Sequence, residues 1–203
     1  MANCVMNNNF ERELPEGYSE VYSIDAADKK IGLRLNIAAL AVSLILLLIP
    51  LVWMGVPRFA SGHMLLFIVL LLGSIIVYLV LHELVHGIAY KLLTHEKLTF
   101  GLTATVAYCG VPDIYVYRRA AMISLLAPFT VFGILFLLGT IVFWRSLAGY
   151  IFGILFAVHC GGCAGDLYDT FLYLTRFRSP KTLMRDTGPK QTFYLPEPEE
   201  EKE

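Results

Sequence analysis

Four long apolar runs dominate the pattern of hydrophobic and polar positions along the chain, at residues 33–54, 63–93, 120–144 and 149–174. A helix of about 20 apolar residues crosses roughly 30 Å of hydrocarbon, and each run is long enough to do so. The second run would form a helix about 45 Å long, which is more than one crossing needs. The pattern therefore predicts an all-α polytopic membrane protein with four transmembrane helices.

The segment 97–113, between the second and third runs, has a different pattern. It is rich in Thr, Val and aromatic residues, and it closes with Pro112 and Asp113. These features favour strands over a helix, so we expect a small β-hairpin-like insert between the second and third helices. An edge of this insert, within 99–108, would be able to bind an extended substrate by strand addition.

The two ends of the chain are polar. Residues 1–32 form an N-terminal segment in which 18–24 favours a short strand or a piece that lies on the membrane surface. Residues 33–178 are expected to form one integral membrane domain. Residues 179–203 are first basic and then acidic, a composition typical of a flexible tail.

Composition narrows the class of protein. Hydrophobic residues make up 57% of the 203 residues, charged residues make up 16%, and the mean hydropathy is +0.63, which is unusual for a soluble domain. A net charge of −1 gives no reason to expect a nucleic-acid partner. The first thirty residues lack the basic start and apolar middle of a cleavable signal peptide. None of the four cysteines requires a disulfide.

The basic residues predict the orientation in the membrane. Fourteen of the 16 Lys and Arg residues lie in the N-terminal segment, in the loop between the second and third runs with its flanks, and in the C-terminal tail. The other two loops hold only Arg58 and Arg145. Because cytoplasmic loops carry the excess of Lys and Arg, both termini are expected to be cytoplasmic.

The second apolar run ends in an HExxH pattern formed by His82, Glu83 and His86. On a helix, positions i and i+4 share one face, so both imidazoles can hold one Zn²⁺. Glu83 is rotated about 100° from His82 and can act on a water at the metal as a general base without being a ligand. Three ionisable groups at the end of an apolar run are costly unless they act together.

The fourth run supplies the expected third ligand. In the predicted topology both runs travel toward the cytoplasm, with His82 19 residues from residue 63 and Asp166 17 residues from residue 149. At 1.5 Å per residue, the two depths differ by about 3 Å. His82, His86 and Asp166 would therefore form the three-ligand set of a catalytic zinc, with water in the fourth position.

The fourth run contains further polar residues on either side of Asp166. Asp169 shares a face with Asp166, which favours a hydrogen-bond partner of the site over a ligand. His159 is expected to be a packed, hydrogen-bonded histidine. Together with His159, the pair Cys160 and Cys163 would be able to bind a metal, but the two glycines between them more simply indicate a close helix contact.

Pro128 interrupts the third run. A proline inside a helix has no N–H, so the carbonyl of Ser124 loses its helical donor. Pro128 would then either leave a free backbone carbonyl near the metal or only kink the helix.

These residues resemble those of a known family. HELVH in an apolar helix, the hairpin-like insert, residues 126–128 (LAP) and residues 165–166 (GD) are together similar to the short bacterial zincin membrane peptidases and, more distantly, to site-2 proteases. The resemblance covers about residues 65–178. It implies a bacterial cell-membrane protein with zinc bound by His82, His86 and Asp166 and with Glu83 as the catalytic acid and base.

The sequence thus favours a zinc metalloprotease that cleaves a membrane protein or peptide near the cytoplasmic face. Two alternatives stay open. One is a non-catalytic or metal-handling membrane module that keeps the fold, and the other is a membrane hydrolase of a non-peptide amide or ester. Glu83 separates these classes, because a hydrolase needs it and a structural zinc site does not.

Overall fold

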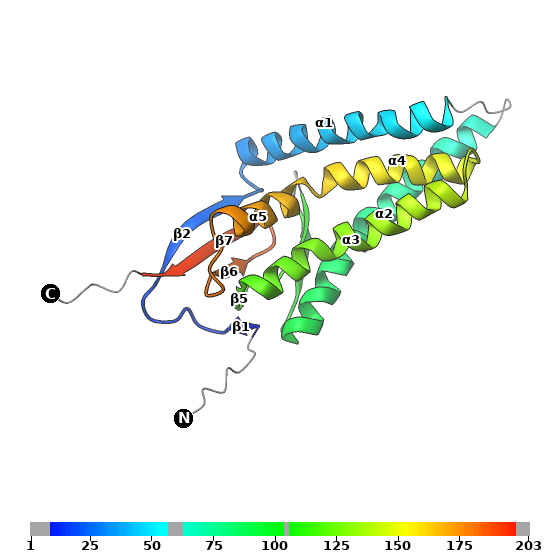
Figure 1. The fold of residues 1–203 in the computed structure, drawn as a ribbon. Coiled ribbons are helices and arrows are strands. Elements are labelled where there is room, and N and C mark those ends of the chain that lie inside the picture. The colour runs from blue at the N-terminus through cyan, green and yellow to red at the C-terminus, as the bar shows by residue number, and fades with distance from the viewer. Residues whose placement is uncertain (1–8, 57–62, 104–105, 198–203) are drawn as a thin grey trace.

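A computed structural model describes residues 9–56, 63–103 and 106–197. Long helices pack side by side, and a β-sheet lies at one end of them (Figure 1). The helices are α1 (Lys29–Met54), α2 (His63–Thr94), α3 (Arg118–Val142), α4 (Leu147–Gly162) and α5 (Ala164–Thr175). The strands are β1 (Phe10–Glu11), β2 (Tyr18–Asp25), β3 (Thr99–Leu102), β4 (Ala107–Gly110), β5 (Tyr115–Tyr117), β6 (Leu183–Asp186) and β7 (Lys190–Pro196).

The predicted apolar helices are present. Among the described residues, α1, α2 and α3 are long and apolar enough to cross a membrane. Large apolar side chains such as Leu44, Val69 and Leu138 are exposed along them. An apolar exterior over this length suits hydrocarbon and would be unfavourable in water.

The fourth predicted span is broken. α4 and α5 are separated at Cys163 and bent by 47°, and the pair counts as a fourth crossing only when it is taken as one span. The break places Asp166 in the first turn of α5. The partial positive charge of a helix N-terminus stabilises a carboxylate there.

The prediction of an all-α protein is wrong. A five-stranded antiparallel sheet has the order β1-β5-β6-β7-β2, so it joins the N-terminal segment, the end of the insert and the C-terminal segment. The strand expected near residues 18–24 is β2.

The prediction of a flexible C-terminal tail is wrong for residues 183–196, which contain β6 and β7. The acidic end of the tail, at 198–203, lies outside the described residues. The tail is ordered because the aromatic side chain of Phe193 is buried against Tyr173 and Phe177.

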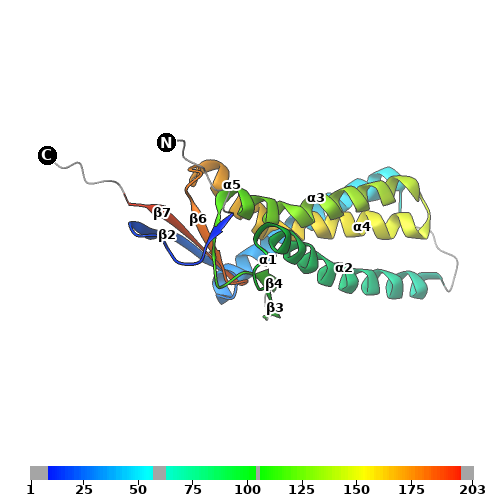
Figure 2. The same ribbon diagram turned by 90° about the horizontal axis from the view of Figure 1, so that it is seen from below.

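The hairpin-like insert is confirmed. β3 and β4 form a separate two-stranded antiparallel sheet, which lies beside the end of α2 (Figure 2). The register pairs Phe100 with Cys109 and Leu102 with Ala107.

Two buried clusters hold these parts together. One lies among the helices and includes Tyr78, Phe132 and Phe136. The other joins the helix ends to the sheet and includes Tyr90 and Phe193. The Tyr90 hydroxyl also donates to Asp186 Oδ2 over 2.7 Å, which ties α2 to β6.

The close helix contact expected near Gly161 is present between α4 and α1. A Cβ atom at Gly161 would overlap Ser43 Oγ and the Ala39 carbonyl oxygen. The absence of a side chain is therefore what lets the two helices approach, as at the small-residue interfaces of membrane helices.

Gly161→Ala should lower the thermal unfolding midpoint in detergent, since overpacking costs about 1–3 kcal/mol. Gly73→Ala is the matched control, because a Cβ at Gly73 has no atom within 4 Å. The control should be neutral or stabilising by up to about 1 kcal/mol through helix propensity. Equal midpoints for the two variants would contradict this packing.

Candidate metal centre

The three predicted ligands come together in the structure. His82 and His86 lie one turn apart on α2, and Asp166 reaches them from the first turn of α5. Both histidines are only 7% exposed, and the Asp166 side chain is 18% exposed. The convergence required by the sequence argument is therefore found, although ligation itself stays a prediction.

The spacing of the donor atoms suits a tetrahedral ion. Asp166 Oδ2 lies 3.5 Å from His82 Nε2 and 3.4 Å from His86 Nε2. A charge-assisted hydrogen bond would be shorter, at about 2.7–2.9 Å. Tetrahedral bonds of about 2.0–2.1 Å place neighbouring ligand atoms about 3.3–3.4 Å apart. The observed separations match the ligand spacing and not a direct hydrogen bond.

The backbone of α3 fixes the orientation of His86. His86 Nδ1 lies 2.9 Å from the Ser124 carbonyl oxygen, and since a carbonyl only accepts, Nδ1 carries the proton. This is the carbonyl that Pro128 leaves without a helical donor. The sequence left open whether Pro128 opens the backbone near the metal or only kinks the helix. In the structure, the carbonyl that Pro128 frees accepts a hydrogen bond from His86. In the neutral ring, the lone pair is then on Nε2, which lies 3.4 Å from Asp166 Oδ2.

His82 is oriented in the same way by a different group. Its Nδ1 lies 3.0 Å from the Tyr78 hydroxyl, one turn earlier on α2. Because the outer nitrogen of each imidazole has a partner, both Nε2 atoms are available for a metal, the arrangement typical of histidine ligands. Two Nε2 atoms and one carboxylate oxygen are a donor set that Zn²⁺ accepts, so these residues fit the ion that the sequence implies.

A cavity of about 180 Å³ adjoins the three donors. Glu83 lines it next to His82 and His86, as a general base beside a metal must. Asn36 of α1 and the hairpin strand β4, including Tyr108, also line the cavity. The cavity therefore adjoins both the donors and the hairpin.

Two further carboxylates line this cavity. Asp169 was expected to hydrogen-bond at the site, but among the described residues its buried Oδ1 has no hydrogen-bond partner. Asp186 was missed by the sequence argument, because it lies in the segment expected to be a tail. Burial raises the pKa of Asp186 to about 6, while hydrogen bonds from Tyr90 and the Gly188 N–H lower it.

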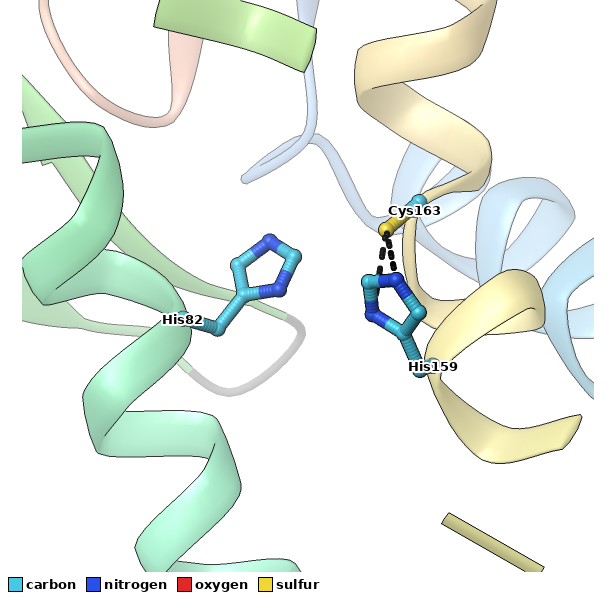
Figure 3. A group of neighbouring side chains, drawn as sticks. All are labelled: His82, His159 and Cys163. Atoms are coloured by element: carbon cyan, nitrogen blue, oxygen red, sulfur yellow. Dashed lines mark hydrogen bonds between the residues drawn. The ribbon is translucent and has the colours of Figure 1, made fainter. Parts of the chain in front are cut away.

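A second group of donor side chains consists of His82, His159 and Cys163, whose donor atoms lie within 4.8 Å of one another. Figure 3 shows Cys163 facing the His159 ring, with Sγ 3.5 Å from Nδ1 and 4.0 Å from Nε2. His159 is fully buried and hydrogen-bonded, as the sequence predicted. Cys160 is not part of this group.

Comparison with known proteins identifies one family. A family model described as "Putative zincin peptidase" matches residues 75–182, a range that contains His82, Glu83, His86 and Asp166. No curated protein and no solved structure matches the chain.

Pro128→Ala should weaken zinc binding by about 10-fold, because the restored N–H at position 128 would compete with His86 for the Ser124 carbonyl. Competition with a chromophoric chelator in detergent measures this affinity. Thr130→Ala, on the same helix, changes a hydroxyl that bonds only its own helix at Leu126 and serves as the control. Unchanged affinity in folded Pro128→Ala would show that the carbonyl does not orient His86.

Proposed function

The chain belongs to the family described as "Putative zincin peptidase", whose model spans more than half of it, and we propose that it is a zinc-dependent metallopeptidase. It would hydrolyse a peptide bond within the membrane or at its surface, near the cytoplasmic face. The observation that carries the proposal is the spacing of 3.4 and 3.5 Å between the two Nε2 atoms and Asp166 Oδ2.

His82, His86 and Asp166 would hold the ion. When bound, zinc supplies Lewis-acid chemistry toward a water molecule and a carbonyl oxygen. The hydrogen bonds of both histidines support this assignment, since each Nδ1 already has a partner and each Nε2 lies 3.4 or 3.5 Å from Asp166 Oδ2.

Glu83 would carry the proton in both halves of the reaction. Its carboxylate takes a proton from the attacking water and then delivers it to the nitrogen of the leaving amine. Its place on the cavity wall, directly after His82 in the sequence, supports this role.

The membrane setting rests on the apolar helices. The donors lie toward the end of α2 nearest the sheet, and the exposed apolar side chains of α1, α2 and α3 would face lipid. With the orientation given by the Lys and Arg residues, the sheet and the site would lie on the cytoplasmic side.

The substrate would be an extended or locally unwound segment. A helix has its carbonyls in hydrogen bonds, so it cannot offer one to attack. The hairpin faces the cavity through Val106 and Tyr108, and pairing with a strand of this hairpin would hold a substrate beside the donors.

Glu83→Gln should lower turnover by about 10²–10⁴-fold and leave one zinc per chain, since the variant removes a proton carrier and no ligand. His86→Ala is the contrasting variant and should lose zinc as well. The assay uses protein in liposomes with quenched fluorescent peptides, before and after chelation and zinc restoration. Activity retained in Glu83→Gln would overturn its role.

The same assay separates the alternatives. Zinc binding without turnover of any peptide, amide or ester would favour a metal-handling module. Turnover of a non-peptide amide or ester alone would identify the other class of hydrolase.

Proline placed in turn at positions 99 to 102 should slow cleavage of peptides, because proline removes an N–H from β3. Zinc content should stay unchanged, since no donor lies in this strand. Cleavage at the wild-type rate in all four variants would show that the hairpin does not bind substrate.

A further inference from the structure

We propose that His159 and Tyr78 form a positioning relay that fixes the tautomer of His82, and that the relay begins at a backbone carbonyl of α3. The inference rests on the proposed zinc site for its purpose, but its geometry is independent of any ion. His159 lies on α4, two turns before Asp166 in sequence and outside the ligand set.

The first step concerns His159. Its Nε2 lies 3.1 Å from the Phe129 carbonyl oxygen. A carbonyl only accepts, so the proton of the neutral ring is on Nε2 and Nδ1 is an acceptor. In the described part of the chain, its hydrogen bonds go to Tyr78, Phe129 and Cys163 and none goes to a carboxylate. A cationic ring that is fully buried without a carboxylate would be costly, so the ring is neutral.

The second step concerns the Tyr78 hydroxyl, which has a single proton to give. It lies 2.9 Å from His159 Nδ1 and 3.0 Å from His82 Nδ1. Since His159 Nδ1 accepts, the Tyr78 proton is directed to His159. The hydroxyl oxygen must then accept from His82, so His82 carries its proton on Nδ1 and its Nε2 is a free donor atom.

Both histidines of the centre are thus oriented by carbonyls of one helix. Ser124 of α3 orients His86 directly, and Phe129 of α3 orients His82 through the two side chains of the relay. Such outer partners typically contribute 10–100-fold to metal affinity.

Aromatic packing holds the relay in place. Phe129 stacks on His159 with ring centroids 5.8 Å apart, and Phe132 and Phe136 contact both His159 and Tyr78 edge-on. The packing restricts rotation of the imidazole, so the direction of the hydrogen-bond chain stays fixed.

This geometry favours a positioning role for His159 over metal binding in the second donor group. The in-plane directions of His159 Nδ1 and Nε2 are used by Tyr78 and by the Phe129 carbonyl. The Cys163 sulfur lies beside the His159 ring, 3.5 Å from Nδ1 and 4.0 Å from Nε2 (Figure 3). His159 is therefore a positioning residue, and Cys163 is a packing partner of its ring.

The direct test is the tautomer of His82 in zinc-free protein. With only five histidines in the chain, ¹⁵N-histidine labelling and NMR in detergent can assign the His82 and His159 rings by comparing variants. The proposal predicts Nδ1–H for His82 and Nε2–H for His159. An Nε2–H tautomer on His82 in wild-type protein would overturn it.

The second test uses variants and zinc affinity. His159→Phe and Tyr78→Phe should each weaken zinc binding by about 10-fold and shift His82 toward the other tautomer. The double variant should be about as weak as either single one, since both break one chain. His159→Asn, which keeps an acceptor near Tyr78, should bind more tightly than His159→Phe.

Cys160→Ala is the control and should change neither zinc affinity nor the His82 tautomer, because Cys160 is only partly buried and is not among the donor groups. Unchanged affinity and tautomer in folded His159→Phe would contradict the relay. A wild-type protein that binds no zinc would defeat the proposed function, and the tautomer measurement would still decide the relay.

Discussion

A histidine points one ring nitrogen at a metal when a hydrogen bond to its other ring nitrogen fixes the orientation and tautomer of the ring. The proposed metal centre depends on such a hydrogen bond at both His82 and His86. In an apolar helical body, little water is available to provide it. Two backbone carbonyls of α3 provide these hydrogen bonds. The Ser124 carbonyl, freed by Pro128, accepts directly from His86, and the Phe129 carbonyl is connected to His82 through His159 and Tyr78. Helix α3, which supplies no ligand, therefore determines the orientation of both histidines.

A second constraint acts on the carboxylate. Asp166 follows a helix break, so its position depends on how α5 is held relative to α2. The sheet holds it: Tyr173 and Phe177 pack on Phe193 of β7, and Tyr90 of α2 bonds Asp186 of β6. Segments from both ends of the chain thus fix the distance between the two helices that carry the donors.

The apolar helices and the convergence of His82, His86 and Asp166 could be predicted because their signals are local or additive. The apolar runs give α1, α2 and α3, and counting residues along two runs places Asp166 at the depth of His82. This estimate of depth holds although the fourth run is broken. The break at Cys163 lies only three residues before Asp166, so the bend of 47° changes the position of Asp166 along the helix axis only slightly. Pro128 likewise indicated a free carbonyl but not its partner.

The sheet could not be predicted in the same way. Its strands are short, come from three distant segments, and in β6 show burial at Leu183, Met184 and Asp186 instead of alternation. Their pairing is a long-range property that no single segment displays. Asp186 and the relay from Phe129 were missed for the same reason, because each joins residues far apart in sequence.

X-ray absorption at the zinc edge tests the central claim most directly. Protein purified with one zinc per chain should show two imidazole rings and further oxygen ligands at about 2.0–2.2 Å, with no sulfur. A sulfur ligand at about 2.3 Å, or a single imidazole, would contradict a centre built from His82, His86 and Asp166.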